Sequence, residues 1–278
     1  MDEVVVDPSL LNGRDGATRW MNLGWWERTT RYPEAAAALA RQVGRAAGLR
    51  TGDHVLDVGC GAGDSPALWV REFGVAGVTA VEPNPTLATT ARDRIDRWGL
   101  GGRITVQTRT AESVTAHDGI ERMDAVVAVD VAYHIRTRAR WLQRLGAITR
   151  PGTRFGSFDI ALRHAEDRAR VVRQAHRAGI PTENLWTVDE IVPTLTSAGF
   201  TQVTIRHAEA EVFAGFVHFA RRQAVRLAAH PRRGGWRALG TALLLATAAQ
   251  RLSAVVIGAQ RGEGSPSGHS DTFDISAT

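Results

Sequence analysis

Hydrophobic and polar positions change their period several times between residues 32 and 162, which divides this stretch into candidate helices and strands. The run PEAAAALARQVGRAAGL after Tyr32 has the 3.6-residue period of a helix. Strand-like and helical segments then alternate: HVLDV, a helix from Asp64, GVTAVE, a helix over 85–98, RITVQT, DAVVAVD, a helix over 137–148, and TRFGSFDI. Such alternation implies right-handed crossovers and a parallel sheet covered on both faces. The sequence therefore predicts a doubly wound α/β fold.

The second half of the chain is less regular and is predicted to be mostly helical. RHAEDRARVVRQAHRAG and VDEIVPTLTSAGF favour helices and TQVTIRH a strand, and a long helical region precedes a last strand, SAVVIGAQ, which we expect at the sheet edge. The predicted units are a helical lid over residues 1–50, a ligand-binding core over 51–160, cap helices and the last strands over 161–260, and a disordered tail over 261–278.

Composition narrows the possible chemistry. The chain has 278 residues, of which 44% are hydrophobic and 23% charged, as in a globular protein with a full core. Cys60 is the one cysteine, so no internal disulfide or thiolate cluster can form, and a reduced, cytoplasmic setting is expected. All 34 basic residues are arginine. The absence of lysine excludes Schiff-base chemistry, a phosphate-loop lysine and the lysine of kinases.

The net charge of +5 does not by itself indicate nucleic acid, because the arginines are spread among acids along most of the chain. The longest apolar stretch, residues 238–249, is interrupted by Gly240 and Thr241 and is shorter than the roughly 20 residues of a spanning helix. We expect a small-molecule partner, no nucleic acid and no membrane-spanning segment, and a homo-oligomer is left open.

A glycine-rich turn is the most informative motif. VLDVGCGAGD, residues 55–64, is an apolar strand that leads into Asp57, Gly59, Gly61 and Gly63 and then into a helix. Glycines in such a turn let the backbone approach a ligand closely. In the dinucleotide fingerprint the third glycine stands three residues after the second, whereas the glycines here occupy every second position. This spacing argues against a dinucleotide enzyme.

The pattern D-x-G-x-G-x-G resembles the first motif of class I S-adenosylmethionine-dependent methyltransferases, in particular those that act on small molecules in natural-product pathways. The resemblance implies a Rossmann-like, mostly parallel seven-stranded sheet and S-adenosylmethionine as the cofactor. Glu82 ends the next apolar strand, VTAVE, and matches the family acid that binds the ribose hydroxyls. Asp57 matches the acid that orients the glycine loop near the methionine ammonium.

Two further segments match the family. TAESV, residues 110–114, corresponds to the loop that holds an acid against the adenine amino group, but threonine stands where aspartate is usual. The adenine contact then passes to Glu112 or to the backbone amide of Ala111. DAVVAVDVAYHI, residues 124–135, corresponds to the strand and turn beneath the transferred methyl group, and places Asp130 among the cofactor-binding residues. It lacks the prolines that DNA amino-methyltransferases carry there, so nucleobases are not the expected acceptors.

The sequence identifies the residues that contact the methyl acceptor less clearly than those that contact the cofactor. MNLGWW, residues 21–26, resembles the entry segment of small-molecule methyltransferases, whose amino-terminal helices fold over acceptor and cofactor. Trp25 and Trp26 either exclude water from the acceptor or pack a terminal helix on the sheet. The aromatic and arginine-rich helix over residues 213–230 borders an acceptor pocket, lies on an anionic membrane surface, or forms a core or subunit contact.

Methyl transfer from a sulfonium is an in-line displacement, so the protein mainly aligns the reacting atoms in a dry site. If the acceptor is a hydroxyl, a general base helps, and His134 follows the fourth strand at the ligand-binding edge of the sheet. Asp159 ends the next strand and is expected to hold the imidazole in one tautomer. Tyr133 points into the same pocket or packs beneath it. No trio of acids follows the fourth strand, so a metal-independent reaction is expected.

Together these features predict an enzyme, an S-adenosylmethionine-dependent methyltransferase that acts on a small, largely apolar acceptor in bacterial specialised metabolism. O-methylation with His134 as the base is the first hypothesis. Carbon methylation of an alkene or prenyl chain, or N-methylation by positioning alone, is the second. A third, of another class, is a non-catalytic protein that binds S-adenosylmethionine.

Overall fold

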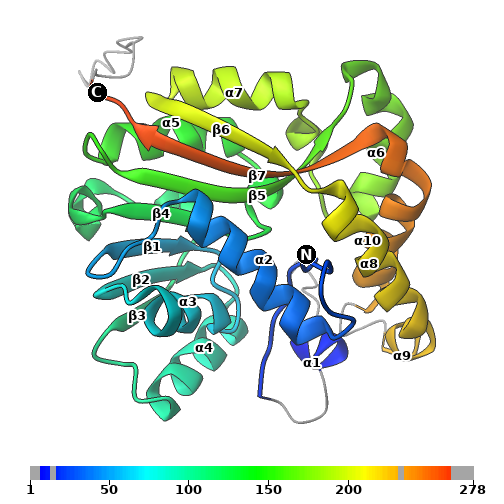
Figure 1. The fold of residues 1–278 in the computed structure, drawn as a ribbon, viewed down its shortest axis with the longest axis horizontal. Coiled ribbons are helices and arrows are strands. Elements are labelled where there is room, and N and C mark those ends of the chain that lie inside the picture. The colour runs from blue at the N-terminus through cyan, green and yellow to red at the C-terminus, as the bar shows by residue number, and fades with distance from the viewer. Residues whose placement is uncertain (1–6, 13–16, 231–234, 264–278) are drawn as a thin grey trace, which may run out of the picture.

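The computed structural model describes residues 7–12, 17–230 and 235–263 of the chain. Its centre is one seven-stranded sheet in the order β3-β2-β1-β4-β5-β7-β6 (Figure 1). The strands are β1 (His54–Val58), β2 (Gly77–Glu82), β3 (Ile104–Thr108), β4 (Ala125–Ala128), β5 (Arg154–Leu162), β6 (Phe200–His207) and β7 (Leu252–Arg261). The first five are parallel, and β7 is antiparallel to both β5 and β6. The predicted doubly wound, mostly parallel seven-stranded sheet is confirmed.

Helices cover both faces of the sheet. They are α1 (Pro8–Leu11), α2 (Tyr32–Ala46), α3 (Asp64–Leu68), α4 (Pro85–Arg97), α5 (Arg138–Ile148), α6 (Arg168–Arg177), α7 (Val188–Ser197), α8 (Glu209–Arg222), α9 (Ala224–Ala228) and α10 (Gly235–Ala248). Successive strand residues point to opposite faces. Val55 therefore joins the hydrophobic cluster that includes α2 and α4, whereas Leu56 joins the cluster that includes α5 and α7.

A pair of glycines brings α2 close to the sheet. Gly156 of β5 and Gly258 of β7 are direct partners in the strand register. A Cβ on Gly156 would lie 2.7 Å from Ala47 Cβ, and one on Gly258 would lie 2.7 Å from the carbonyl oxygen of Ala46. Only glycine permits this distance of approach. The end of α2 thus rests directly on the backbone of two central strands.

The expected place of the last strand was wrong. β7 lies between β5 and β6, so β6 is the edge strand. β7 is buried along almost its whole length, whereas β6 alternates between buried or half-buried and exposed positions. A near-continuous apolar run is typical of a central strand and alternation is typical of a strand with one wet face. The composition of SAVVIGAQ already contained this signal.

The later helices form a separate group beside the sheet. α10 packs against α6, α8 and α9, and these helices lie together to the right in Figure 1.

Within the described ranges, no helix is long and apolar enough to cross a membrane. The division into lid, core and cap stays a prediction. Most of the predicted tail lies outside the described residues, although Arg261 belongs to β7 and is buried.

Candidate active site

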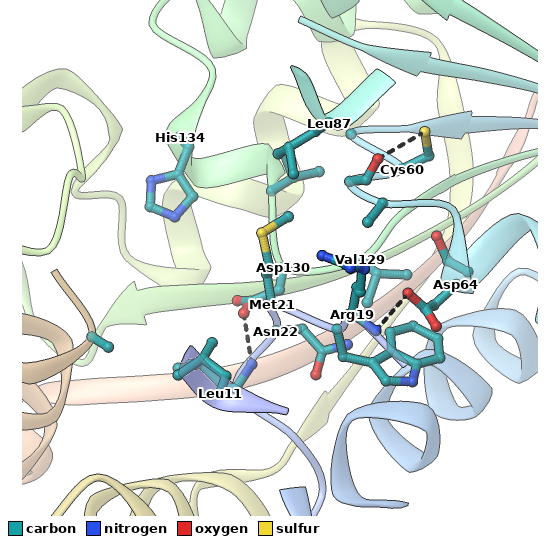
Figure 2. Close-up of a pocket in the computed structure, with 18 of the residues that line it drawn as sticks. Leu11, Arg19, Met21, Asn22, Cys60, Asp64, Leu87, Val129, Asp130 and His134 are labelled. Atoms are coloured by element: carbon teal, nitrogen blue, oxygen red, sulfur yellow. Dashed lines mark hydrogen bonds between the residues drawn. The ribbon is translucent and has the colours of Figure 1, made fainter. Parts of the chain in front are cut away.

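A cavity of about 260 Å³ lies beside the carboxyl ends of β1, β2 and β4. This is the edge at which open α/β sheets bind ligands. Its walls come from the glycine-rich loop after β1, the turn after β4, an entry segment defined here as residues 17–26, and the helices α8 and α10. In the view of Figure 2, His134 lies toward one end of the cavity and Cys60 and Asp64 toward the other, with Met21 and Asp130 between them.

The glycine-rich loop presents bare backbone to the cavity. Gly59, Gly61 and Gly63 have φ values of 72°, 55° and 89°, a region that residues with a side chain rarely adopt. A Cβ on Gly59 would lie 2.6 Å from a methyl carbon of Val131, and one on Gly61 would lie 2.8 Å from Met21 Cε. Gly59 and Gly61 line the cavity, while Gly63 precedes α3. The alternating spacing seen in the sequence therefore has a steric reason at each position.

Glu82 ends β2 and lies in the cavity wall. Its two carboxylate oxygens accept hydrogen bonds from the backbone N–H groups of Gly61 and Asn84, each at 2.9 Å. Burial raises the pKa of the Glu82 carboxyl, and the two N–H donors oppose this shift. A carboxylate oxygen can accept more than one donor. The acid that anchors the glycine loop thus keeps acceptor capacity toward the cavity.

Asp57 lies beneath the loop and is not part of the cavity wall. It is fully buried in β1, and one carboxylate oxygen accepts a hydrogen bond from Trp69 Nε1 at 2.7 Å. The other oxygen has no hydrogen-bond partner among the described residues. Desolvation raises the pKa of Asp57 to about 6. These contacts fit the expected role in supporting the loop, and the expected contact with a ligand ammonium stays a prediction.

A buried ion pair at one end of the cavity was not predicted. Arg94 of α4 donates to both carboxylate oxygens of Asp64, at 2.6 and 2.9 Å, and its guanidinium carbon lies 4.4 Å from the Trp98 ring centre. Asp64 also accepts from the backbone N–H of Arg19, at 3.1 Å. One carboxylate therefore joins α3, α4 and the entry segment. Sequence patterns gave no signal for it, because Asp64 and Arg94 are distant in the chain.

Asp130 connects the turn after β4 to the entry segment. Its carboxylate accepts the backbone N–H of Leu23 at 2.8 Å and the hydroxyl of Tyr133. Its backbone has a positive φ of 60°, which is uncommon for a residue with a side chain. Desolvation raises the pKa of Asp130 to about 7, although both hydrogen bonds act in the opposite direction. Asp130 and Tyr133 line the cavity, which is one of the two positions that the sequence left open for Tyr133.

Trp25 and Trp26, two of the three tryptophans in the entry segment, do not line the cavity, so their expected acceptor role was wrong. Trp25 is buried and stacks beneath the guanidinium of Arg206, 4.6 Å from the ring centre. Trp26 packs against Phe219 of α8, with 5.6 Å between ring centres. Both side chains pack inside the protein, as in the alternative that the sequence left open, but on β6, α2 and α8 instead of between a terminal helix and the sheet. Other residues of the same segment line the cavity instead: Arg19, Trp20, Met21, Asn22 and Leu23.

His134 lies in the cavity, at the end of a short 3₁₀ turn (Ala132–His134) after β4. Its ring Nδ1 is 2.7 Å from the backbone carbonyl oxygen of Gly179, which follows α6. The side-chain amide of Asn184 donates to the carbonyl oxygens of Tyr133 and Ile135, at 3.0 and 2.6 Å. The loop after α6 therefore holds both the imidazole and the turn that carries it.

The expected pairing of His134 with Asp159 was wrong. Asp159 is fully buried in β5 and pairs with Arg138 of α5, at 2.7 Å from Nη2. Burial raises the pKa of Asp159 to about 6, and the Arg138 guanidinium opposes this shift. A guanidinium gives a buried carboxylate a permanent opposite charge, which neutral imidazole does not. Arg138 stands four residues after His134, so the competing partner was visible in the sequence.

Ala111 and Glu112 do not line the cavity. They belong to a short 3₁₀ turn (Ala111–Ser113) after β3, and the Glu112 carboxylate accepts the hydroxyl of Thr137 at 3.2 Å. Their expected contact with adenine stays a prediction. Among the residues with described positions, no group of three or more potential metal ligands occurs. Metal independence likewise stays a prediction.

The cap contributes cavity residues, of which the sequence indicated only Phe216, as part of a helix that could border an acceptor pocket. Phe216 of α8 and Arg237, Ala238 and Thr241 of α10 line the cavity, as does Ala178 after α6. The region expected as one helix over residues 213–230 is divided between α8 and α9, and it reaches the pocket through Phe216, while Phe213 and Phe219 are buried in the core. No local pattern identifies the residues of α10, because their position depends on how α8 and α10 pack against each other.

Comparisons with known proteins agree with this geometry. Residues 55–152 match a family described as a methyltransferase domain. Over 196 residues the chain is 28% identical to erythromycin 3''-O-methyltransferase of Saccharopolyspora erythraea, a match that covers 67% of this chain and 63% of that protein. The chain thus spans just under two thirds of the length of this relative.

Two solved structures have a similar fold over most of their length. The cyclase SpnF has a TM-score of 0.74 and 20% identity, with 92% of this chain and 93% of that chain covered. The mycolic acid cyclopropane synthase CmaA1, in complex with SAH and CTAB, has a TM-score of 0.73 and 15% identity, with 90% and 92% covered. Residues 55–152 therefore match a methyltransferase domain, and the glycine loop and the strand order agree with the fold of class I S-adenosylmethionine-dependent methyltransferases.

Proposed function

We propose that this chain transfers the methyl group of S-adenosylmethionine to a hydroxyl of a small, largely apolar acceptor in bacterial specialised metabolism, with His134 as the general base. The observation that carries the proposal is the position of His134. It lines the same cavity as the glycine loop and Glu82, and its ring Nδ1 contacts the Gly179 carbonyl at 2.7 Å. A histidine in this place can accept the acceptor's hydroxyl proton.

The residues present fit the cofactor. The glycine loop forms a cradle in which a Cβ at Gly59 or Gly61 would clash, and Glu82 offers acceptor capacity beside it. Glu82 would hold the ribose hydroxyls, and the loop backbone would support the amino acid part. When bound, S-adenosylmethionine supplies an electrophilic methyl group on a sulfonium. The chain then has to position the acceptor, exclude water and remove one proton.

The contact with Gly179 sets the tautomer of His134. A carbonyl oxygen only accepts hydrogen bonds, so Nδ1 carries the hydrogen and donates it. In the neutral ring the basic lone pair is then on Nε2. The backbone carbonyl takes the orienting role that an acid has in a catalytic triad. We assign Nε2 of His134 as the atom that receives the acceptor's proton.

Apolar side chains supply the dry surroundings that such a displacement needs. Leu11, Trp20, Leu23 and Phe216 line the cavity together with His134. The relative from Saccharopolyspora erythraea is an O-methyltransferase by name, which supports oxygen as the methylated atom. The similar fold of a cyclase supports the alternative without methyl transfer, and that of a cyclopropane synthase supports carbon as the target.

The test is His134→Ala, assayed with isotope-labelled S-adenosylmethionine, extracts of the source organism, and mass spectrometry of the products. We expect the rate to fall by about a hundredfold to ten-thousandfold, because proton removal is lost. Affinity for S-adenosylhomocysteine should stay within a few fold. His218→Ala changes an exposed histidine of α8 outside the cavity and serves as the control.

The pH profile of the wild-type rate should have one ascending limb, and this limb should disappear in the His134 variant. Full activity of His134→Ala would contradict O-methylation by a histidine base. Carbon or nitrogen methylation by positioning alone would then be favoured. Binding of S-adenosylhomocysteine without any labelled product would instead favour the non-catalytic alternative.

A further inference from the structure

Two neighbouring helices of the cap carry exposed apolar side chains. Within the described ranges, three large hydrophobic side chains are exposed: Val225 of α9, at 86%, and Trp236 and Leu243 of α10, at 46% each. Trp236 and Leu243 are seven residues apart, so they lie on the same face of α10. Exposed apolar residues that lie close together on one part of a protein are typical of an interaction surface.

The opposite side of α10 lines the cavity. Ala238 and Thr241 belong to the cavity wall. An α-helix has about 3.6 residues per turn, so Ala238 points almost directly away from Trp236, which stands two residues earlier. One helix therefore separates the exposed apolar residues from the candidate active site.

The positive charge of the chain is concentrated in the same group of helices. Together α6, α8, α9 and α10 contain eight arginines and two acids, Glu209 and Glu211, both in the first turn of α8. These counts give a net charge of +6, compared with +5 for the whole chain. The rest of the chain is thus close to neutral, and the cap is the basic part of the molecule.

Two of the arginines of α6 lie beside the exposed face of α10. Arg173 and Arg177 are exposed, and no acid that the structure describes pairs with them. They are four residues apart and share one face of α6. A Cβ on Gly240 would lie 3.0 Å from the carbonyl oxygen of Arg177. Since Gly240 stands one turn after Trp236, the end of α6 borders the exposed apolar face.

This combination of side chains fits the surface of an anionic lipid bilayer. Tryptophan favours the level of the lipid headgroups, and aliphatic side chains enter the boundary between headgroups and acyl chains. Arginine extends an apolar stem and places its charge beside the lipid phosphates. A second copy of the chain would bring like charges together, and RNA would leave aliphatic side chains in water.

We propose that the outer cap surface, defined as Arg173, Arg177, Val225, Trp236 and Leu243, binds the surface of an anionic lipid bilayer without crossing it. Because α10 also lines the cavity, the bound membrane lies next to the acceptor side of the site. An apolar acceptor then enters from the bilayer instead of from water. Only this route of the acceptor rests on the proposed function, and the binding to the bilayer does not.

The experiment measures sedimentation of the full chain with vesicles. One set of vesicles contains phosphatidylcholine alone, and the other contains equal parts of phosphatidylcholine and phosphatidylglycerol. We expect binding to the mixed vesicles to be about tenfold tighter or more, because each arginine near an anionic surface contributes to the affinity. Added salt should weaken this binding. Equal binding to both vesicles, or binding to neither, would overturn the proposal.

Variants then locate the surface. Trp236→Ser combined with Leu243→Ser should weaken binding to the mixed vesicles by about tenfold, because two partly exposed apolar side chains no longer leave water. Arg173→Gln combined with Arg177→Gln should weaken it by about tenfold as well.

The control removes two exposed charges outside the cap. Arg97→Gln combined with Arg122→Gln should leave vesicle binding within twofold of the wild type. All of these side chains are at least partly exposed, so the urea midpoint of each variant should match that of the wild type. An equal loss of binding in the control and in the α6 variant would indicate a general charge effect and overturn the proposal.

The other partners give different results. Loss of binding in the α6 variant, with none in the Trp236 and Leu243 variant, would indicate recognition of a polyanion such as RNA and would overturn the proposal. A wild-type dimer in gel filtration that the Trp236 and Leu243 variant dissociates, without vesicle binding, would assign the surface to a second copy and overturn it too. Full activity of His134→Ala would reject the base and leave the vesicle result unchanged.

Discussion

Replacing Glu82 with glutamine tests the cofactor site, because the change removes the charge and keeps the shape of the side chain. In the native protein both carboxylate oxygens accept a backbone N–H, from Gly61 and from Asn84, each at 2.9 Å. Glutamine offers one oxygen and one NH₂ group, so only one of these N–H donors keeps its acceptor. The other donor faces an NH₂ group and loses its hydrogen bond.

The substitution should change both the free energy of unfolding and the affinity for S-adenosylhomocysteine. An unsatisfied buried donor costs about 1–3 kcal/mol, so the free energy of unfolding should fall by about that amount. A ligand hydroxyl that donates to Glu82 loses a charged acceptor, a hydrogen bond of about 1.5–3 kcal/mol, and 1.4 kcal/mol corresponds to about tenfold in affinity. We expect about a tenfold to hundredfold loss of S-adenosylhomocysteine affinity in Glu82→Gln. Glu82→Ala, which removes both acceptor oxygens, should lose about a hundredfold or more.

The measurements are calorimetric titration with S-adenosylhomocysteine and urea unfolding of the same samples. Glu121→Gln makes the same chemical change at an exposed position and should alter neither quantity. Unchanged affinity in both Glu82 variants, with the fold intact, would refute the placement of the ribose beside β2. A loss of stability without a loss of affinity would mean that Glu82 only anchors the glycine loop.

Further outcomes are expected elsewhere in the molecule. Arg94→Met leaves a buried carboxylate without its partner and should lower the free energy of unfolding by about 3–5 kcal/mol, measured by urea unfolding. Because burial raises the pKa of Asp57 to about 6 and of Asp130 to about 7, the native state retains protons that the unfolded state loses above a pKa of 3.8. The urea concentration at the midpoint of unfolding should therefore fall as pH rises from about 4 to 7. In Asp130→Asn this midpoint should depend less on pH near the upper end of that range, because the group with the pKa of about 7 is absent. Asp159→Asn should leave the ascending limb of the pH–rate profile in place, since a backbone carbonyl orients the His134 ring; a shifted limb would contradict this assignment.

The alternation of strand-like and helical segments was enough to predict the parallel half of the fold, because the hydrophobic period of each segment there matches the element that it forms. The same reasoning failed for β7, whose place depends on pairing with two strands far away in the sequence. Its continuous apolar character marked it as a central strand, but the chain order suggested an edge. Pairing over long distances along the chain is decided by tertiary contacts that local periodicity does not contain.

The residues of the candidate site likewise fall into those that local sequence predicts and those that it does not. Gly59, Gly61 and Glu82 were identified from the sequence because their backbone geometry and charge are required by local structure and by the family motif. Trp25 and Asp159 were placed wrongly, because an arginine from another element reaches each of them: Arg206 stacks on the indole and Arg138 pairs with the carboxylate. The cavity residues of α10 had no sequence signal, since their place in the cavity depends on the packing of separate helices.

The position of β7 also has a consequence for synthesis of the chain. The register pairs Arg154 of β5 with Gln260 of β7, so this contact spans a long part of the sequence. Until residues 252–261 have left the ribosome, β5 has one open edge and β6 has no strand to pair with. Open strand edges are templates for aggregation. A truncation or fusion that disturbs these late residues would therefore affect the middle of the sheet, and nascent chains would depend on rapid completion or on chaperones to remain monomeric.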